Sequence, residues 1–307
     1  MMNETKMEKL REVFGEALQE NIAMSNYTTA RVGGPVPALI AIHTIEDLTQ
    51  AAQTLWSLEI PFNLLGSGSN ILVSDHGLDH VILHNRAHNL RIDSKSENPT
   101  AMAESGAILG TVARQTALRG LSGMEWAAPV PGTVGGAVYG NAGAHGSDMA
   151  ASLKVAKILH AKKGVEDWPV EKLAYQYRSS ILKREKMPVV ILSAVFSLAP
   201  TSREEAKGKI SEFQSYRKGT QPPGASMGSM FKNPSDDHAG RLIEAAGLKG
   251  KRIGQAKISP VHANFIVNLE GAKAQDIYQL MSLAQETVKE QFGVQLEPEI
   301  ELLGEFD

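Results

Sequence analysis

The chain has 307 residues, 42% of them hydrophobic, with 31 basic and 34 acidic side chains and therefore a net charge of −3. This length fits two or three modules of roughly 100–150 residues each, and the balanced charge argues against a dedicated nucleic-acid-binding protein. The absence of cysteine excludes disulfides, Fe–S clusters, thiolate zinc sites and cysteine nucleophiles. The nine histidines have no metal-binding spacing, so no metal site is expected.

The start of the chain has no apolar core of the kind found in signal peptides. The longest apolar stretch, residues 188–200, is well short of the ~20 residues that a membrane span requires. We therefore expect a cytoplasmic protein without membrane insertion.

The N-terminal part of the chain combines helical and strand patterns. Apolar residues recur at helical spacing over 5–20, and Thr44, with Asp47 three residues later, begins a second helix that runs to about Leu58. Strands are predicted at PALIAIH, IPFNLLG and NILVS.

Between about 60 and 200, short apolar runs broken by turns favour mixed or antiparallel sheets with few helices. The predicted strands here are HVILHN, TAMAES, VAKILHA and VVILSAVFSL. In the last third, Ser202 and Glu205 form a capping box for a helix to about Tyr216, which indicates a boundary near 199–203. A short helix at 240–246, a strand at HANFIVN, a long amphipathic helix at 274–292 and a closing strand at EPEIELLGEF follow.

A glycine- and serine-rich segment is the first candidate for a ligand site. It consists of Leu65, Gly66, Ser67, Gly68, Ser69 and Asn70. The segment lacks the third glycine of a dinucleotide-binding fingerprint and precedes a β-rich run rather than a helix. Its backbone N–H groups can form an anion-binding nest, although a tight hairpin turn is the simpler interpretation of this segment alone.

A second glycine-rich segment, PVPGTVGGAVYGNAG, begins about 65 residues later, and ten of the chain's 28 glycines lie between Gly106 and Gly146. Glycine allows a ligand to approach the backbone closely. Two such segments, each among strands, favour a nucleotide cofactor with a pyrophosphate over two unrelated turns.

Three further segments carry polar groups suited to chemistry. Arg178 lies between tyrosines in YQYRSS, where a guanidinium orients a carboxylate through two parallel hydrogen bonds; a surface strand with a stacked arginine is the alternative. Ser229 in GSMFKNP is a candidate hydroxyl donor, but no G-x-S-x-G elbow or histidine–acid set accompanies it. Glu297, Glu299 and Glu301 share one face of a strand, so most of them are expected to be solvated.

The order of these segments resembles the UDP-N-acetylenolpyruvoylglucosamine reductase family. The resemblance extends from about residue 22 to the C-terminus and rests on NYTTARVGGP, LLGSGSNILVSDHG, PVPGTVGGAVYGNAGAHG, YQYRSSIL, GSMFKNP, AGRLIEAAGLKG, HANFIVN and LEPEIELLGE. It is closest to the shorter type, which lacks an extra tyrosine-bearing loop. Two local departures are GSGS in place of the commoner GGGS, and Pro260-Val261 in place of a more polar lead into HANF.

The resemblance implies an α+β FAD-binding fold of the vanillyl-alcohol-oxidase type. Two FAD-binding subdomains are expected at 1–85 and 86–200, followed by a substrate domain at 201–307 whose last strand returns toward the flavin. The implied cofactors are noncovalent FAD and NADPH as cosubstrate. The implied reaction reduces UDP-N-acetylglucosamine-enolpyruvate to UDP-N-acetylmuramate in peptidoglycan precursor synthesis.

The resemblance also assigns site residues. Arg178 and Glu299 are expected to flank the substrate carboxylate, and Ser229 to donate a proton. Because two ionised carboxylates repel, we expect Glu299 to have a raised pKa and to be protonated at some stage. The expected cofactor contacts are Leu65, Gly66, Ser67, Gly68, Ser69, Asn70, Pro131, Gly132, Thr133, Gly135, Gly136 and Asn141. The expected substrate contacts are Tyr177, Arg178, Lys232, Asn233, Lys249 and His262.

Two other functions stay open from the sequence. One is another FAD-dependent oxidoreductase of the same fold, such as an oxidase that uses oxygen; the other is a catalytically silent nucleotide-sugar-binding protein. The presence of Arg178, Ser229 and Glu299 together argues against the silent protein, because a binding module needs no such trio.

Overall fold

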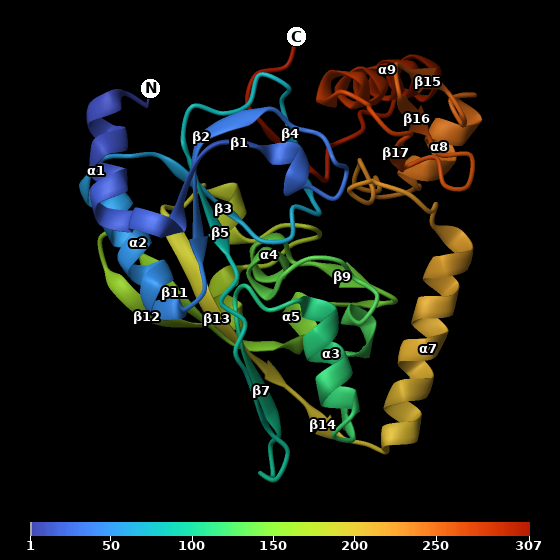
Figure 1. Cartoon of the computed structure of the whole chain (residues 1–307). Helices are drawn as coiled ribbons and strands as arrows, with labels where there is room; N and C mark the ends of the chain where they lie inside the picture. Colours follow the sequence, from blue (N-terminus) through green and yellow to red (C-terminus); the bar gives the residue numbers. More distant parts are fainter. Residues whose placement is uncertain (1) are drawn as a thin grey trace.

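The computed structural model describes residues 2–307; Met1, which belongs to the expected domain 1–85, lies outside them. Three units follow one another along the chain, coloured from blue to red in Figure 1. The chain runs from an N-terminal sheet through a middle sheet to a C-terminal unit, and helix α7 (Arg203–Thr220) links the last two.

The N-terminal unit is a four-stranded mixed sheet in the order β1-β2-β5-β3. It comprises β1 (Leu18–Ala23), β2 (Pro35–Ile42), β5 (Val81–Asn85) and β3 (Phe62–Leu65), with helices α1 (Glu4–Phe14) and α2 (Ile45–Ser57) packed against it. The Thr44 hydroxyl accepts a hydrogen bond from the Asp47 amide at 3.0 Å, as the sequence indicated for this cap. Because β2, β5 and β3 are mutually parallel, their carboxyl ends lie at one edge of the sheet.

The expected helix over 5–20 is wrong in its last part. Helix α1 ends at Phe14, and Gly15 has a φ of 48°, a left-handed value that breaks the helix. Residues Leu18–Ala23 instead pair antiparallel with β2 as an edge strand. The apolar spacing persists across Gly15, so the pattern alone does not reveal the break.

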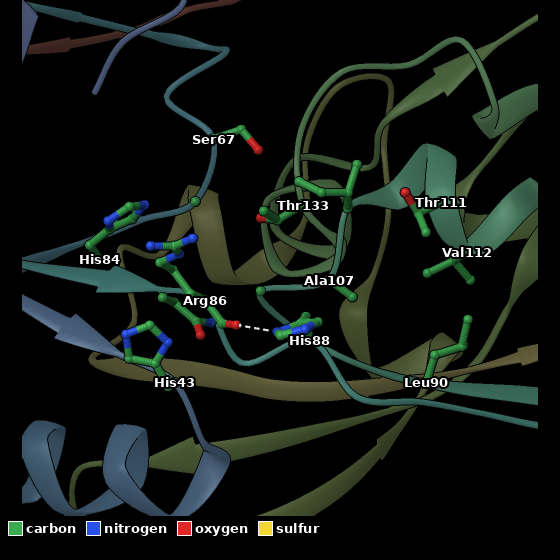
Figure 2. Close-up of a pocket in the computed structure, with 14 residues that line it drawn as sticks. His43, Ser67, His84, Arg86, His88, Leu90, Ala107, Thr111, Val112 and Thr133 are labelled. Carbon is green, nitrogen blue, oxygen red and sulfur yellow. Dashed lines mark hydrogen bonds between the residues drawn. The ribbon is translucent and has the colours of Figure 1, made fainter. Parts of the chain in front are cut away.

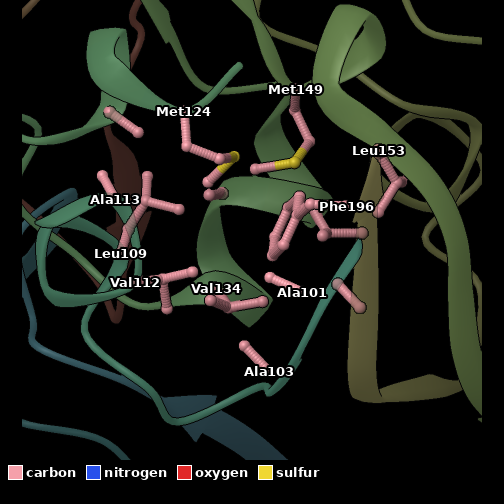
Figure 3. Packing of buried hydrophobic residues seen from close by; sticks show 14 of the residues in the cluster. Ala101, Ala103, Leu109, Val112, Ala113, Met124, Val134, Met149, Leu153 and Phe196 are labelled. Carbon is pink, nitrogen blue, oxygen red and sulfur yellow. The ribbon is translucent and has the colours of Figure 1, made fainter. Parts of the chain in front are cut away.

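The middle unit is an antiparallel five-stranded sheet in the order β12-β11-β13-β7-β6. It comprises β12 (Gly164–Pro169), β11 (Leu153–His160), β13 (Val189–Ser197), β7 (Thr100–Glu104) and β6 (Leu90–Asp93), with helices α3 (Leu109–Ala117) and α4 (Val134–Gly140) packed on it. Phe196 of β13 is fully buried there; Figure 3 draws it close to Met149 and Val134. Neither helix was expected from the sequence, because both lie in the glycine-rich region where turns were anticipated.

Helix α7 packs on the middle unit. Its N-terminal cap is the one predicted from the sequence, because the Ser202 hydroxyl accepts a hydrogen bond from the Glu205 amide at 3.0 Å. Ala206 and Ile210 are buried in the same core cluster as Phe196. The domain boundary expected between residues 200 and 201 stays a prediction. The first turns of α7, which follow that boundary, are buried in the core of the middle unit.

The C-terminal unit packs helices α8 (Ala239–Ala245) and α9 (Ala274–Phe292) around a small sheet of β15 (Arg252–Ile253), β16 (Ala256–Ile258) and β17 (Ile266–Asn268). Its last strand, β18 (Glu301–Leu303), leaves this unit and pairs in parallel with β4 (Ile71–Val73) of the N-terminal part. The remaining short elements are η1 (Gly15–Ala17), η2 (Met24–Asn26), β8 (Leu121–Ser122), η3 (Glu125–Ala127), β9 (Gly143–Ala144), β10 (Ser147–Asp148), α5 (Met149–Ser152), η4 (Val170–Leu173), α6 (Ile181–Arg184) and β14 (Ala199–Pro200).

Side chains of the N-terminal part also hold the C-terminal unit. The two carboxylate oxygens of Asp75, just after β4, accept hydrogen bonds from the Ala274 and Gln275 amides, both at 2.9 Å. These amides are among the N–H groups that a helix leaves unpaired in its first turn. Asp75 therefore caps α9 from a distant part of the chain, and its negative charge suits the positive end of the helix dipole.

We expect Asp75→Ala to lower the free energy of unfolding by about 1–2 kcal/mol, the usual cost of removing a helix cap. The measurement is urea denaturation followed by circular dichroism. Asp79→Ala is the matched control, because within residues 2–307 the exposed Asp79 side chain pairs only with its neighbour His80, at 3.4 Å. Equal stability of the two variants would contradict the capping role.

Candidate active site

The two glycine-rich segments meet in the structure. A Cβ atom at Gly66 would lie 2.4 Å from the Thr133 hydroxyl oxygen, and one at Gly132 would lie 3.2 Å from the Ser69 hydroxyl oxygen. Gly68 has a φ of +61° and packs against the Tyr27 carbonyl, where a Cβ would clash at 2.1 Å. The loops thus approach so closely that only the smallest residues fit between them.

A cavity of about 410 Å³ opens beside these loops, at the carboxyl ends of β2, β3 and β5 (Figure 2). It is lined by His43, Gly66, Ser67, His84, Asn85, Arg86, His88, Leu90, Gly106, Ala107, Ile108, Thr111, Val112 and Thr133. No aspartate or glutamate is among these fourteen residues. A cavity of this size, bordered by backbone amides and cations, fits part of an anionic dinucleotide such as FAD.

The second segment turns into helix α4, and its two adjacent glycines differ in surroundings. Gly135 donates its amide to the Ser105 carbonyl at 2.8 Å, and a Cβ there would lie 3.0 Å from the Ser105 Cβ. Gly136 is exposed, and the nearest atom to a Cβ would be the Thr133 hydroxyl oxygen at 3.8 Å. The open space over Gly136 leaves its backbone accessible to a flat ring, whereas Ser105 fills the space over Gly135.

Three of the other expected cofactor residues pack against or form hydrogen bonds with other groups of the protein. Leu65 is buried in a core cluster with Val36 and Ile82. The Asn141 side chain donates to the Gln176 carbonyl at 3.0 Å and to Asp148 at 3.2 Å, and accepts the Ala150 amide at 3.0 Å. Asn70 donates its side-chain N–H to the Glu299 carbonyl at 3.2 Å. Pro131 is exposed. The cofactor contacts of these four residues stay predictions.

Arg178 and Glu299, which the resemblance places beside the substrate carboxylate, form a charged pair with each other. The Arg178 Nε lies 2.8 Å from Glu299 Oε1, and their side chains are only 25% and 19% exposed. Arg178 lies in the turn between Gln176 and Ser179, which exchange backbone hydrogen bonds at 2.9 and 3.0 Å, and its φ is 54°. Since Asn141 holds the Gln176 carbonyl, this side chain positions the turn that presents Arg178.

The environment of Glu299 acts on its pKa in two directions. Burial raises the pKa of Glu299, whereas the positive charges of Arg178, Lys183 and Lys232 lower it. The burial effect is the larger, so the pKa of Glu299 is raised from its ordinary value. This direction agrees with the raised pKa expected from the sequence, whereas protonation of Glu299 during the reaction stays a prediction.

The residues that follow Ser229 pair with the backbone on either side of Glu299. Residues 230–232 run antiparallel to 297–299, with the Glu299 amide donating to the Met230 carbonyl at 2.8 Å and the Lys232 amide to the Glu297 carbonyl at 2.9 Å. Asn264 of HANF holds the segment: its side chain accepts a hydrogen bond from the Phe231 amide at 3.0 Å and donates one to the Phe231 carbonyl at 2.7 Å. Ser229 is half-buried and directly precedes this pairing. Its backbone forms an antiparallel β-bridge with Phe265 of HANF.

The three glutamates of the closing segment each face a different cation. Glu299 pairs with Arg178, Glu301 with Lys183 at 2.6 Å, and Glu297 with Lys232. Glu297 and Glu301 are 68% and 40% exposed, so the expectation that most of these carboxylates are solvated is confirmed. Glu299 is the exception that burial distinguishes.

A second cavity, of about 440 Å³, lies next to the charged pair. Its lining residues are Gln176, Tyr177, Ser179, Arg184, Lys232, Asn233, Pro234, Gln295 and Glu297. Tyr177, Lys232 and Asn233 were expected from the sequence, whereas Arg184 and Gln295 were missed because each lies outside the recognised motifs.

Lys249 and His262 lie apart from both cavities. Lys249 Nζ is 2.8 Å from a Glu244 carboxylate oxygen, and the His262 ring packs against Gly240 and Phe265. Burial lowers the pKa of His262, with a smaller contribution from Lys249. The predicted contact of these two residues with the substrate nucleotide stays untested.

The fold and the comparisons define a class of protein: an FAD-dependent oxidoreductase with a further C-terminal unit. The FAD binding domain family matches residues 36–162, and the family described as UDP-N-acetylenolpyruvoylglucosamine reductase, C-terminal domain, matches residues 220–303. The chain belongs to the UDP-N-acetylenolpyruvoylglucosamine reductase family, as similarity along nearly its whole length demonstrates.

Reductases of this name from two bacteria illustrate the similarity. That of Rubrobacter xylanophilus is 43% identical over 92% of this chain and 94% of its own length. That of Bacillus subtilis is 38% identical over 96% of each chain. The crystal structure of the reductase from Thermus caldophilus is 34% identical, with a TM-score of 0.78 over 94% of this chain and 100% of that one.

These comparisons confirm the main expectations from the sequence. The chain has the FAD-binding α+β fold, and it is an FAD-containing UDP-N-acetylenolpyruvoylglucosamine reductase of peptidoglycan synthesis that acts on a small molecule. Within residues 2–307, no helix has the length and apolar character for crossing a bilayer. The same residues include no cluster of three or more His, Asp or Glu side chains placed to hold a metal ion.

The contrast between Gly135 and Gly136 yields a prediction about the cofactor. We expect Gly136→Val to fold with near-normal stability but to retain much less FAD, because its side chain enters open space beside the cofactor loops. Gly135→Val is the matched control and should destabilise the protein itself through its contact with Ser105. Flavin absorbance per protein and thermal unfolding of the flavin-free forms separate the two effects. Normal FAD content in Gly136→Val would show that no cofactor lies over this glycine.

Proposed function

We propose that Arg178, Glu299 and Ser229 catalyse the reduction of the enolpyruvyl group of UDP-N-acetylglucosamine-enolpyruvate, with NADPH as the source of hydride. The reaction adds a hydride to the methylene carbon and a proton to the α-carbon, giving UDP-N-acetylmuramate. Bound FAD takes up hydride from NADPH and supplies it to the substrate. The proposed division has the cofactor between 1–85 and 86–200 and the substrate on 201–307. We propose the cytoplasm as the location of this reaction.

Arg178 is proposed to bind the substrate carboxylate. Its Nε is engaged by Glu299 at 2.8 Å, which leaves the two terminal nitrogens to form a two-pronged contact with an anion. Negative charge develops on this carboxylate and on the α-carbon when hydride reaches the methylene carbon. A fixed, half-buried guanidinium stabilises that charge more strongly than water does.

Glu299 is proposed to act in its protonated form on the other side of the carboxylate. An ionised Glu299 would repel the substrate carboxylate, and its raised pKa reduces this repulsion. A protonated carboxyl also donates a hydrogen bond, which stabilises the developing charge. Binding of the anionic substrate raises the pKa of Glu299 further, since like charges disfavour each other.

Ser229 is proposed to deliver the proton to the α-carbon. Its half-buried position at the start of the segment paired with 297–299 supports this role. A serine hydroxyl is a weak acid, but the carbanion is a strong base, so transfer is downhill when the two are in contact. The Arg178–Glu299 pair, with the segment directly after Ser229 paired to residues 297–299, is the observation that supports the proposal.

The second cavity is proposed to hold the sugar and diphosphate of the substrate. Its cations are Lys232 and Arg184, and its aromatic side chain is Tyr177, which is 53% exposed. Lys232 is paired with Glu297, so an entering diphosphate replaces one anion by another. An oxidase acting on a substrate without a diphosphate would not require this cationic cavity.

The first test is Ser229→Ala. The proton is needed only when the substrate is reduced, so we expect flavin reduction by NADPH to stay near normal. Flavin reoxidation by substrate should slow by about 10²–10⁴-fold, the usual contribution of general acid catalysis. Anaerobic stopped-flow absorbance measures each half separately, and Ser235→Ala, which removes an exposed hydroxyl bonded to Asp236, is the control. Equal slowing of both halves would mean that Ser229 is structural.

The second test follows the titration of Glu299. Because its pKa is raised, the protonated form persists above the ordinary carboxyl range near pH 4.3 and is lost as the pH rises through the raised value. We expect flavin reoxidation by substrate to slow on this alkaline side. Glu299→Gln should remove this pH dependence, while Glu305→Gln, an exposed control, keeps it. An unchanged profile in Glu299→Gln would assign the titration to another group.

A further inference from the structure

Residues 178–183 meet the closing segment through two ion pairs, and the proposed mechanism uses only one of them. The Arg178 Nε lies 2.8 Å from a carboxylate oxygen of Glu299, and the Lys183 Nζ lies 2.6 Å from one of Glu301. Glu299 and Glu301 are two residues apart, so their Cα atoms are separated by at most about 7 Å. The Lys183–Glu301 pair therefore lies beside the buried carboxyl of Glu299.

Helix α6 fixes the position of Lys183. The helix begins after Ser180, which is fully buried and donates its hydroxyl to the Tyr139 carbonyl of α4 at 2.6 Å. The same hydroxyl accepts a hydrogen bond from the Lys183 amide at 3.3 Å. The Lys183 side chain is only 20% exposed, so its charge is screened less by solvent than that of a surface lysine.

Asn70 fixes the other half of the pair. Its backbone carbonyl accepts a hydrogen bond from the Glu301 amide at 2.9 Å, and its side chain donates one to the Glu299 carbonyl at 3.2 Å. Glu301 also opens β18, where it is the partner of Ile71 on β4. One residue thus holds the backbone of both glutamates, which keeps the second ion pair at a constant place relative to Glu299.

Charged groups from several elements surround the Glu299 carboxyl. They are Arg178 from the turn before α6, Lys183 from α6, Lys232 from the segment 230–232, and Glu297 and Glu301 from its own segment. Tyr139 of α4 also faces Glu301, and burial together with the charge of Glu301 raises the pKa of this phenol. Each lysine is thus paired with a flanking glutamate, whereas Arg178 is paired with Glu299 itself.

The two charges of the Lys183–Glu301 pair act on Glu299 in opposite directions. A nearby cation favours the ionised form of a carboxyl, and a nearby anion disfavours it. Lys183 lowers the pKa of Glu299, although burial has the larger effect and raises it. Because Glu301 is 40% exposed, the pair adds little to stability. Its consequence is that the attraction of Lys183 for an ionised Glu299 is offset.

We propose that Glu301 is a positioning residue for the reaction, which cancels the charge of Lys183 so that Glu299 keeps its proton when the substrate carboxylate binds. The inference rests on the proposed role of a protonated Glu299. Neither Lys183 nor Glu301 lines either of the two cavities described above. Both residues are therefore expected to act through Glu299 and not by touching the substrate.

The test is a double-mutant cycle in the full-length protein with its FAD, read from the pH profile of flavin reoxidation by substrate. Glu301→Gln leaves Lys183 uncancelled, so we expect the alkaline loss of rate to begin at lower pH. Lys183→Met leaves the negative charge of Glu301, so we expect this loss at higher pH. At one pH on the alkaline side, the first variant should be slower and the second faster than wild type, each by about threefold to tenfold, which corresponds to a half to one pH unit.

The double variant Lys183→Met/Glu301→Gln should return close to the wild-type profile, because both charges are removed together. Lys157→Met and Asp167→Asn are the matched controls, since they break an exposed ion pair of 3.0 Å between β11 and β12. Both controls should keep the wild-type profile. Titration by ¹³C NMR of protein labelled at its glutamate carboxyls follows Glu299 without turnover, and its signal is the one missing from Glu299→Gln.

Shifts of both single variants in the same direction, or equal slowing at every pH, would overturn the proposal and indicate a structural role for the pair. A Glu299 NMR midpoint that moves in neither single variant would also overturn it. Failure of the proposed function has a different signature. In that case the NMR midpoint moves in opposite directions in the two variants, as expected for the pair, while flavin reoxidation does not follow it.

Discussion

Residues Glu297–Leu303 contact three parts of the molecule that are far apart in sequence. They pair with the GSMFKNP segment through Glu297 and Glu299, with Arg178 through the Glu299 side chain, and with β4 through β18. A strand in such a position has its register fixed on both sides, and a shift of one residue would turn Glu299 away from Arg178. The closing segment therefore links the Arg178–Glu299 pair to the segment that follows Ser229 and to β4, directly after the first glycine-rich loop.

Positive and negative charges are balanced along the closing segment, residues 297–303. Each glutamate of the closing segment has its own cation, and Glu299 alone is buried enough for desolvation to exceed the attraction of the neighbouring positive charges. The same types of residue therefore give two ordinary surface ion pairs, each worth little, and one carboxyl with an altered proton affinity. Burial, not composition, distinguishes the functional glutamate.

Much of this organisation was accessible from the sequence. Residues with strong local signals, such as the Thr44 and Ser202 caps and the helix at 274–292, are where they were predicted. The failures have a common cause: Gly15 ends a helix whose apolar spacing continues, and α3 and α4 form in a glycine-rich region because the sheet beneath them buries their apolar faces. Likewise, the roles of Asn141 and Asn264 as supports for Arg178 and Phe231 depend on contacts between distant segments, which a single sequence does not reveal.

The hydrogen bonds of Asn70 connect two events that are usually treated as separate. This residue ends the loop beside the cofactor cavity, donates to the Glu299 carbonyl, and accepts the Glu301 amide at 2.9 Å. A ligand that orders this loop also favours the docked position of the C-terminal strand, and thermodynamic reciprocity requires that docking strengthen retention of the ligand by the same factor. On the proposed cofactor contacts, FAD bound at this loop would therefore also stabilise the pairing of the N-terminal and C-terminal parts of the chain.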